Sequence, residues 1–260
     1  MQYLPVTIVS NTELGPGHHE LVLKVPRPLP EIRAGQFLNL RCDPADRFSL
    51  LRPFSILDFD PMAGTLSIYY KHLGRLSARL SQLPLGTQLE MLYPLGKGFP
   101  WKEDWRHVAV VGGGVGLAPL LLLARQLEPY GASMSVDGYF GGATAVDLVS
   151  ELLGRYDFHI ELATMDGSLG HHGTVVELFA KRYDAYDAVF SCGPNPMLAA
   201  LQKALPAGCA AFASLEEYMA CGVGACYGCT AHVATLAGPQ NQRVCKDGPV
   251  FELRRVIFER

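Results

Sequence analysis

Four of the seven cysteines lie close together near the C-terminus, and their spacing constrains this chain more than any other feature of the sequence. The pattern is Cys221-x4-Cys226-x2-Cys229-x15-Cys245. A C-x4-C-x2-C…C spacing is typical of plant-type [2Fe–2S] sites, in which one short loop supplies three thiolates and a remote strand supplies the fourth. Glycines between the cysteines allow backbone amides to turn towards the sulfurs. The pattern therefore predicts an iron–sulfur cluster.

Other uses of these cysteines stay open at this point. A structural zinc site with four cysteine ligands favours paired C-x2-C knuckles, and the chain has one such pair, so the spacing favours iron–sulfur over zinc. An odd cysteine count and an N-terminus without a visible signal peptide argue against a disulfide framework. Four unligated core cysteines fit poorly with the glycine and polar neighbours.

The first hundred residues carry the pattern of short strands. Runs rich in β-branched and aromatic residues are separated by clusters of Gly, Pro and Asp, as in "GPG", "PRPLP" and "DPMAG". Such a series predicts a small antiparallel β-barrel. One helix is expected in "GRLSARLSQL", residues 74–83, because its leucines recur at helical spacing.

The pattern changes after residue 100, where short apolar strands alternate with helices. This alternation predicts a parallel sheet covered by helices on both faces. We therefore expect a β-barrel domain over 1–100, a doubly wound α/β domain over 101–212 and a C-terminal cysteine segment over 213–260. The last segment has too little apolar content for a core of its own, so it needs a ligand to hold it.

Two loops of the α/β domain have the context of a phosphate-binding turn. Residues 112–116 read Gly-Gly-Gly-Val-Gly between an apolar strand and a helix, and "SCGPNPM" at 191–197 also lies between a strand and a helix. In an open parallel sheet, ligands bind outside the carboxyl ends of the strands, where both loops fall. A tight turn without a ligand, and a small core residue at Cys192, are the simpler alternatives.

A third loop, "TMDGSLGHHGT" at 164–174, is expected at the same edge. Asp166 and Ser168 are candidates to contact a ribose or an amide, although a solvated loop that precedes the next helix is the simpler interpretation. His171 and His172 have no third ligand nearby in the sequence, so we do not interpret them as metal ligands.

The barrel contains one motif whose side chains suit ligand binding, "RPFS" at 52–55. Arg52 offers planar donors suited to a diphosphate, Phe54 offers a ring for stacking, and Ser55 offers a hydroxyl. The strand "IYYK" at 68–71 is a candidate neighbour in the same cleft. Taken alone, this is an ordinary barrel strand with a surface arginine.

Charge and hydrophobicity exclude two classes of partner. The 260-residue chain has 22 Lys and Arg against 25 Asp and Glu, a net charge of −3, which gives no basic surface for nucleic acid. The most apolar helix candidate, 116–127, is too short to span a bilayer. We expect no nucleic acid, no membrane and a cytoplasmic location.

Together these motifs resemble a known family. Arg-Pro-Phe-Ser in a barrel, Gly-Gly-Gly-Val-Gly-Leu-Ala-Pro in a nucleotide domain and a later Cys-Gly-Pro resemble the ferredoxin–NADP reductase superfamily. The C-terminal "SLEEYMACGVGACYGCT" followed by "RVCKDGPVF" resembles the electron-transfer subunits of dihydroorotate dehydrogenase B. The resemblance covers nearly the whole chain, and the cysteine segment is its most specific part.

The resemblance implies cofactors and the residues that hold them. It implies FAD on the barrel, at Arg52, Pro53, Phe54, Ser55, Tyr69, Tyr70, Lys71, Gly74, Leu76 and Ser77. The Gly-Thr pair that usually meets the flavin diphosphate is replaced by Leu76-Ser77. It implies the nicotinamide nucleotide at Gly112, Gly113, Gly114, Val115, Gly116, Cys192, Gly193 and Pro194. It implies the [2Fe–2S] cluster at Cys221, Cys226, Cys229 and Cys245.

The implied function is a relay in pyrimidine biosynthesis. Electrons from dihydroorotate, oxidised on the FMN of a catalytic partner, pass through the cluster and FAD to NAD. The expected assembly has two copies of each chain, and no residue of this chain is expected to touch dihydroorotate or to be catalytic. The loop "GGATAVD", without Arg or Lys, favours NAD over NADP.

Two alternatives remain. One, of the same class, is the small subunit of a ferredoxin:NADP-type reductase or of a sulfide dehydrogenase, or the reductase component of an oxygenase. In those subunits the first cluster position tends to carry Asp, whereas this chain has Cys221. The other, of a different class, is a non-catalytic nucleotide-binding module with a four-cysteine zinc site.

Overall fold

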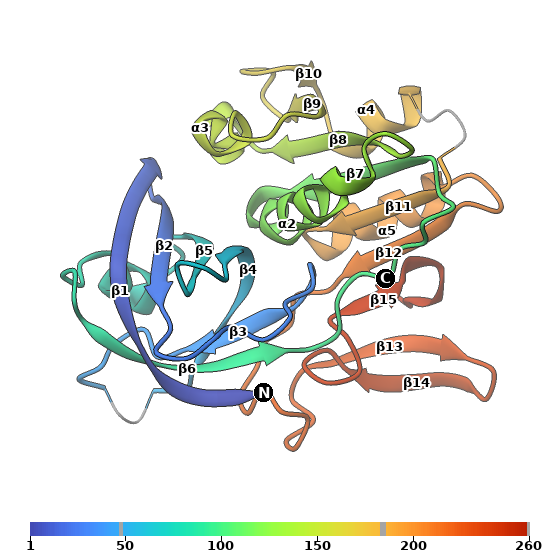
Figure 1. Cartoon of the computed structure of the whole chain (residues 1–260). Helices are drawn as coiled ribbons and strands as arrows, with labels where there is room; N and C mark the ends of the chain where they lie inside the picture. The colour runs from blue at the N-terminus through green and yellow to red at the C-terminus, as the bar shows by residue number, and fades with distance from the viewer. Residues whose placement is uncertain (47–48, 183–185, 259–260) are drawn as a thin grey trace.

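The computed structural model describes residues 1–46, 49–182 and 186–258. A closed antiparallel barrel forms one side of the molecule, a seven-stranded sheet forms the other, and a two-stranded hairpin extends from the C-terminal part of the chain (Figure 1). The expected fold class, a barrel followed by a doubly wound α/β unit and a small cysteine-rich segment, is confirmed. Residues 259 and 260 of the expected C-terminal segment lie outside the described ranges.

The barrel is closed by six strands in the order β1-β2-β5-β4-β3-β6. Alternate residues of its strands point inward, and Leu21, Leu38, Ile56, Ile68 and Met91 are fully buried there. The expected helix at 74–83 is α1, Arg75–Ser81. The barrel strands are β1 Gln2–Gly15, β2 His18–Lys24, β3 Phe37–Leu40, β4 Arg52–Asp60, β5 Thr65–Lys71 and β6 Gln88–Leu95.

The sheet has the order β10-β9-β8-β7-β11-β12-β15, and its first six strands run parallel. Its strands are β7 His107–Gly113, β8 Ser135–Gly142, β9 His159–Thr164, β10 His171–His172, β11 Ala188–Cys192, β12 Ala210–Ser214 and β15 Val250–Glu252. Its α-helices are α2 Leu117–Leu127, α3 Ser150–Leu153, α4 Val175–Arg182 and α5 Asn195–Ala204. Short 3-10 turns are η1 Gly114–Gly116, η2 Glu128–Tyr130, η3 Ala145–Leu148 and η4 Leu253–Arg255.

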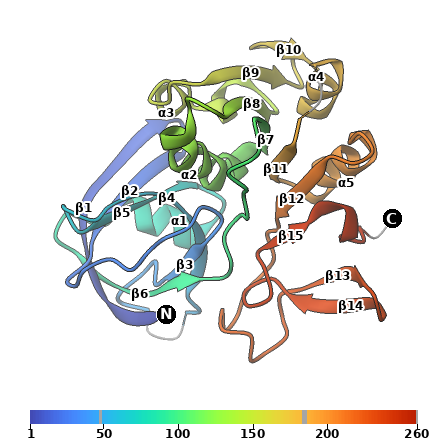
Figure 2. The same cartoon turned by 45° about the vertical axis from the view of Figure 1, so that its right-hand side comes forward.

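Helix α2 lies between the barrel and the sheet (Figure 2). It packs on β4 on one side and on β7 and β11 on the other. Nine of its eleven residues are buried, which explains why this segment is almost wholly apolar. It is too short to span a bilayer, and among the helices that the structure describes none is long and apolar enough to do so.

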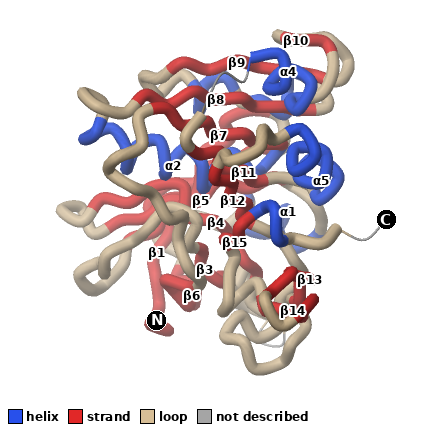
Figure 3. Tube along the Cα trace, turned by 90° about the vertical axis from the view of Figure 1, so that its right-hand side faces the viewer, coloured by secondary structure: helices blue, strands red, loops and turns tan. Residues whose placement is uncertain are grey.

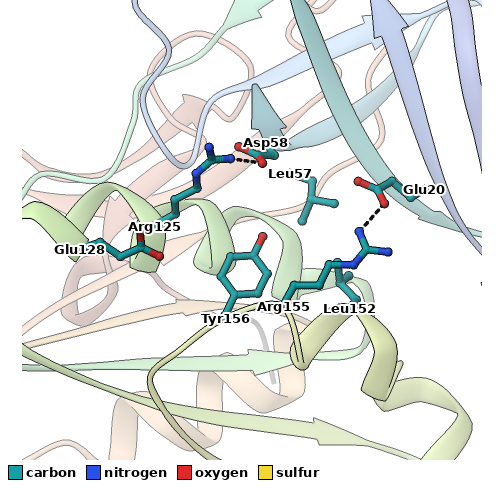
Figure 4. Close-up of a pocket in the computed structure, with 8 residues that line it drawn as sticks. All are labelled: Glu20, Leu57, Asp58, Arg125, Glu128, Leu152, Arg155 and Tyr156. Carbon is teal, nitrogen blue, oxygen red and sulfur yellow. Dashed lines mark hydrogen bonds and ion pairs between the residues drawn. The ribbon is translucent and has the colours of Figure 1, made fainter. Parts of the chain in front are cut away.

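Polar contacts join the barrel to the sheet around a small cavity of about 180 Å³ (Figure 4). Arg125 of α2 pairs with Asp58 of β4, and Arg155 pairs with Glu20 of β2 at 2.6 Å. Gln126 donates to the Ile32 carbonyl at 2.8 Å and accepts from the Ala34 amide at 2.9 Å. These contacts fix the angle between the two halves of the molecule.

The C-terminal part of the chain is tied to both halves. Its hairpin consists of β13, Thr230–Thr235, and β14, Gly238–Arg243, and lies beside the barrel and below the sheet (Figure 3). The chain then returns through β15, which pairs antiparallel with β12. The Lys97 amide at the end of the barrel donates to the Gly248 carbonyl at 2.7 Å. The cysteine-rich segment therefore completes the edge of the sheet rather than forming an independent unit.

Candidate functional site

A large cavity of about 960 Å³ opens between the barrel, the sheet and the segment 214–219. Its barrel wall contains every residue for which the sequence implied a flavin contact. These are Arg52, Pro53, Phe54, Ser55, Tyr69, Tyr70, Lys71, Gly74, Leu76 and Ser77. The volume suits a large elongated cofactor.

Strand pairing brings these residues together. Residues 52–55 open β4, and β4 pairs with β5, which carries Tyr69, Tyr70 and Lys71. The rings of Phe54 and Tyr70 meet edge to face with centroids 6.1 Å apart. Burial raises the pKa of the Tyr69 and Tyr70 hydroxyls, so both stay protonated and can donate hydrogen bonds. The result is a cavity wall of neutral aromatic side chains together with the basic side chains of Arg52 and Lys71.

The altered Gly-Thr position lies at the start of α1. The Ser77 hydroxyl accepts hydrogen bonds from the amides of Leu73 and Gly74 at 3.0 and 3.2 Å and donates to the Gly74 carbonyl. It therefore holds its own turn together. Arg75, which the sequence analysis did not single out, lines the cavity beside it and is highly exposed. Together with Arg52 it gives this end of the cavity two guanidinium groups.

The two predicted nucleotide loops meet at the carboxyl ends of β7 and β11. Gly112 and Cys192 are register partners in these strands. A Cβ at Gly116 would overlap the Cys192 backbone, and a Cβ at Gly113 would lie 2.7 Å from the Met197 sulfur. The glycines are therefore needed for the close approach of the two loops. Val115 is the member of this set that lines the large cavity.

The loop with Asp166 and Ser168 uses both side chains internally. The Ser168 hydroxyl donates to Asp166 at 2.6 Å and accepts from the Ala145 amide at 2.8 Å. These bonds hold two loops of the same sheet edge together. His171 and His172 form the short edge strand β10. A contact of Asp166 or Ser168 with a nucleotide stays a prediction.

The sequence analysis missed the acidic side chain at Glu216. It lines the cavity just after β12, and the Cys192 thiol lies 3.8 Å from its carboxyl oxygen. Its exposed surface faces the cavity, while the protein packed around it raises the pKa of its carboxyl. Cys192 itself is fully buried, which raises the pKa of the thiol. One signal was present, because "SLEE" follows an apolar strand at the same sheet edge as the other loops.

The four clustered cysteines divide into an accessible and a buried half. Cys226 is exposed and Cys221 is half-buried, whereas Cys229 and Cys245 are buried. Backbone amides point at three of the sulfurs. The Cys221 sulfur accepts from the amides of Val223 and Cys226 at 3.5 and 3.4 Å, the Cys226 sulfur from Gly228 at 3.4 Å, and the Cys229 sulfur from Cys245 at 3.5 Å.

These amides change the acidity of the first cysteine. Burial works to raise the pKa of Cys221, but the amides of Val223 and Cys226 outweigh it and lower the pKa to about 6. Burial raises the pKa of Cys245 to about 12. The lowered pKa of Cys221 favours the thiolate, which is the form that binds iron.

The loop conformation fits a cluster rather than a core of free thiols. Gly222, Gly224 and Tyr227 have φ values of 67°, 81° and 59°, which turn amides towards the sulfurs. Arg243 donates to the Gly224 carbonyl at 3.0 Å and pairs with Asp247 at 2.9 Å, and this braces the loop. Among the described residues, no three His, Cys, Asp or Glu side chains lie close enough together to bind a single metal ion. Four thiol donors with inward amides match the ligand chemistry of an iron–sulfur cluster.

Comparison with known proteins gives a consistent result. The iron–sulfur cluster binding domain of dihydroorotate dehydrogenase B matches residues 216–257. The dihydroorotate dehydrogenase B (NAD(+)) electron transfer subunit of Shouchella clausii is 38% identical over 255 residues and covers 97% of both chains. The subunit of the same name from Streptococcus mutans is 37% identical over 256 residues, 98% of both chains.

Solved structures give the same fold. An NADH-dependent reduced ferredoxin-NADP oxidoreductase aligns with a TM-score of 0.85 at 26% identity, over 97% of this chain and 89% of the other. A ferredoxin NADP+ reductase from Neisseria gonorrhoeae, solved with FAD and NADP, aligns with a TM-score of 0.67 at 17% identity. The alignment covers 78% of this chain and 90% of that chain, and it supports the fold alone.

Proposed function

The chain belongs to the family of electron transfer subunits of NAD-dependent dihydroorotate dehydrogenase B, and from this premise we propose which of its residues hold each redox group. It is an oxidoreductase subunit of pyrimidine biosynthesis that uses FAD, a [2Fe–2S] cluster and NAD, and it acts with a catalytic partner. The observation that carries the residue assignments is that one large cavity is lined by all ten residues implied for FAD, by Val115 of the first nucleotide loop and by residues 214–219, which lead into the cysteine loop.

We place FAD in the large cavity. Phe54, Tyr69 and Tyr70 supply an apolar, aromatic surface for the ring system, and Ser55 supplies a hydroxyl beside it. Arg52 and Arg75 lie where they can pair with the diphosphate, and this pairing replaces part of what the usual Gly-Thr pair provides. Ser77 contributes indirectly, because its hydroxyl holds the turn that shapes this end of the cavity.

We place the nicotinamide nucleotide against the two glycine-rich loops. The backbone of residues 112–116 at the end of β7, where Gly114 and Val115 are partly exposed, accepts the phosphates, while Cys192, Gly193 and Pro194 frame the nicotinamide end beside Glu216. Cys192 is buried and neutral, so it acts here through shape rather than charge. The loop 141–147 has no Arg or Lys to pair with a 2′-phosphate, which agrees with NAD.

We place the cluster on Cys221, Cys226, Cys229 and Cys245. When bound, flavin exchanges a hydride with NAD and single electrons with the iron–sulfur group, so it joins two-electron and one-electron chemistry. This chain's own contribution is positional. The barrel wall orients the flavin, the two loops bring the nicotinamide to the same cavity, and the amides of the cysteine loop stabilise negative charge on sulfur.

We propose that the catalytic partner carries FMN, oxidises dihydroorotate on it, and assembles with this chain as two copies of each. Electrons then enter through the cluster and leave as NADH. The exposed side of the cysteine loop at Cys226 supports entry from a partner docked on that side. A cytoplasmic location remains a prediction from the sequence.

A direct test is the absorption and metal content of the chain purified anaerobically. We expect flavin and iron–sulfur bands in one spectrum, one FAD and two irons per chain, and bleaching of both bands by NADH. NADH should act faster than NADPH at equal concentration. A colourless protein that contains zinc and no iron would contradict the proposal and would support the zinc-bearing module.

A further inference from the structure

Asn39, in the barrel strand β3, has a buried amide that the described part of the chain does not satisfy. The residue is fully buried, and neither its Oδ1 nor its Nδ2 has a hydrogen-bond partner there. An unpaired buried amide is costly, and native structures rarely retain one without a reason. The residue therefore calls for a partner that the folded chain alone does not supply.

The direction of this side chain follows from the strand. In β3, Leu38 and Leu40 belong to the core cluster inside the barrel, so Phe37 and Asn39 point to the opposite face. Phe37 lies in the apolar cluster that also contains Cys229 and Cys245. The outward face of β3 therefore lies on the side of the cysteine-rich segment.

Asn39 meets that segment at the first cluster ligand. A Cβ added to Gly222, the residue after Cys221, would overlap the Asn39 amide nitrogen. Gly222 also has a φ of 67°, so both its backbone and its missing side chain suit this approach. The amide donor of Asn39 thus lies against the loop that wraps the cluster.

Asn39 also lies on the strand next to the proposed flavin site. Asn39 is the register partner of Pro53 in β4, in the middle of the motif that lines the large cavity. Asn39 is not itself part of the cavity wall. It therefore lies at the junction between the strand that faces the flavin and the loop that holds the cluster.

We propose that Asn39 is a positioning residue for the iron–sulfur site, whose Nδ2–H donates a hydrogen bond to sulfur at the Cys221 corner of the bound cluster. The inference rests on the proposed cluster site. Donors to sulfur stabilise the reduced, more negative cluster and raise its reduction potential. Asn39 thereby adds a side-chain donor to the backbone donors of the loop and ties the cluster to the flavin strand.

The test is a redox titration of the cluster in the full chain. The electron paramagnetic resonance signal of the reduced cluster monitors the titration. Asn39→Leu removes the donor at similar size, and Asn39→Asp replaces it with an acceptor. Ser67→Ala is the control, because Ser67 is another buried barrel residue whose hydroxyl has no partner among the described residues. Flavin absorption and FAD content serve as internal controls for the barrel.

We expect Asn39→Leu to lower the ratio of reduced to oxidised cluster at a given potential about tenfold, which corresponds to ~59 mV for one electron. Asn39→Asp should lower it further, and Ser67→Ala should leave it unchanged. If Asn39→Leu binds FAD but too little iron to titrate, Asn39→Ser replaces it as the second variant. Asn39→Ser keeps a donor and should lie closer to the wild type than Asn39→Asp does.

Two outcomes contradict different claims. Iron-replete Asn39 variants with the wild-type potential, or equal potentials for the Ser and Asp variants, would overturn the role of Asn39 and leave the cluster site intact. A wild-type chain that binds FAD but no iron would overturn the cluster site itself, and this inference with it.

Discussion

At the scale of single residues, the proposed flavin wall combines neutral tyrosines with the basic side chains of Arg52 and Lys71. The tyrosines of that wall are neutral because burial raises the pKa of their hydroxyls. At Cys221, in contrast, backbone amides lower the pKa of the thiol and favour the thiolate. Glu216 brings a carboxyl to the cavity beside the buried Cys192 thiol. Under the proposed assignment, these groups lie where charge changes during electron transfer, at the nicotinamide and at the cluster.

Glu216→Gln tests the first of these positions. The oxidised nicotinamide ring is positive and the reduced ring is neutral, so a nearby carboxylate favours NAD⁺ over NADH. For charges partly screened by solvent this amounts to about 1 kcal/mol. We expect the affinity for NAD⁺ to fall about fivefold and the affinity for NADH to change little, as measured by product inhibition. Glu128→Gln, at the small cavity of Figure 4, is the control. Equal losses for both nucleotides would contradict this role for Glu216.

At the scale of elements, strand pairing and loop contact decide which residues meet. The sequence predicted the barrel and the parallel sheet because their strands carry strong local patterns. It also predicted the cavity-lining stretches at 52–55 and 69–71 through their resemblance to a family. It did not predict β15, which has three residues and exists only because β12 offers an unpaired edge.

The sequence also could not predict contacts between residues far apart in the chain, because they too depend on how folded elements meet. Nothing local to Asn39 indicates that Gly222 packs on it, because more than 180 positions separate them and the contact arises from two folded units meeting. The contact of Glu216 with Cys192 is of this kind too. Spacing within one loop, as among the cysteines, is local, so the sequence could predict the ligand set but not the residues around it.

The ion pair between Lys71 of β5 and Asp147 of η3 predicts an effect of pH on the stability of the fold. Burial works to raise the pKa of Asp147, but the hydrogen bonds from Lys71 at 2.5 Å and from Thr144 outweigh it and lower the pKa. A lowered carboxyl pKa stabilises the fold above the unfolded value, near 4, and this stabilisation is lost as the pH falls through the folded pKa.

We expect Asp147→Asn to lower the free energy of unfolding at pH 7 by about 1–2 kcal/mol, or the Tm by about 2–8 °C. The difference from the wild type should stay constant from pH 8 to about pH 5 and begin to shrink near pH 4. Glu151→Gln, which removes an exposed partner of Arg155, should change the Tm by much less. A difference that grows on acidification would contradict this account.

The contact between the two nucleotide loops predicts a selective effect on NAD binding. A Cβ at Gly116 would overlap the Cys192 carbonyl, so Gly116→Ala must push the two loops apart. Such overpacking costs about 1–3 kcal/mol. We expect the KM for NADH in flavin reduction to rise about tenfold, with FAD and iron content unchanged. Gly15→Ala is the matched control, because a Cβ there meets nothing within 4 Å. An unchanged KM would show that the loops do not frame the nucleotide.

At the scale of the whole molecule, the three parts of the chain that we propose hold the cluster, FAD and NAD pack against one another. The cysteine loop packs on the outer face of β3, the large cavity lies on the neighbouring strand β4, and Val115 and Asn195 of the two glycine-containing loops line the same cavity from the sheet. Ion pairs across the interface, such as Arg155 with Glu20, hold these parts at a fixed angle (Figure 4). A rigid arrangement suits electron transfer, because the redox groups need constant separation and little solvent around them.

The central claim is that electrons cross from the partner to NAD through the cluster of this chain. The most direct measurement is dihydroorotate-dependent NAD reduction by the complex with its FMN-containing partner, compared with complexes that carry Cys229→Ala or Cys209→Ala. Cys209 is a buried free cysteine directly before β12, outside the cluster loop. We expect full activity with Cys209→Ala. With Cys229→Ala we expect at least a hundredfold loss, while NADH still reduces FAD in that variant. NAD reduction at the wild-type rate without iron would contradict the relay.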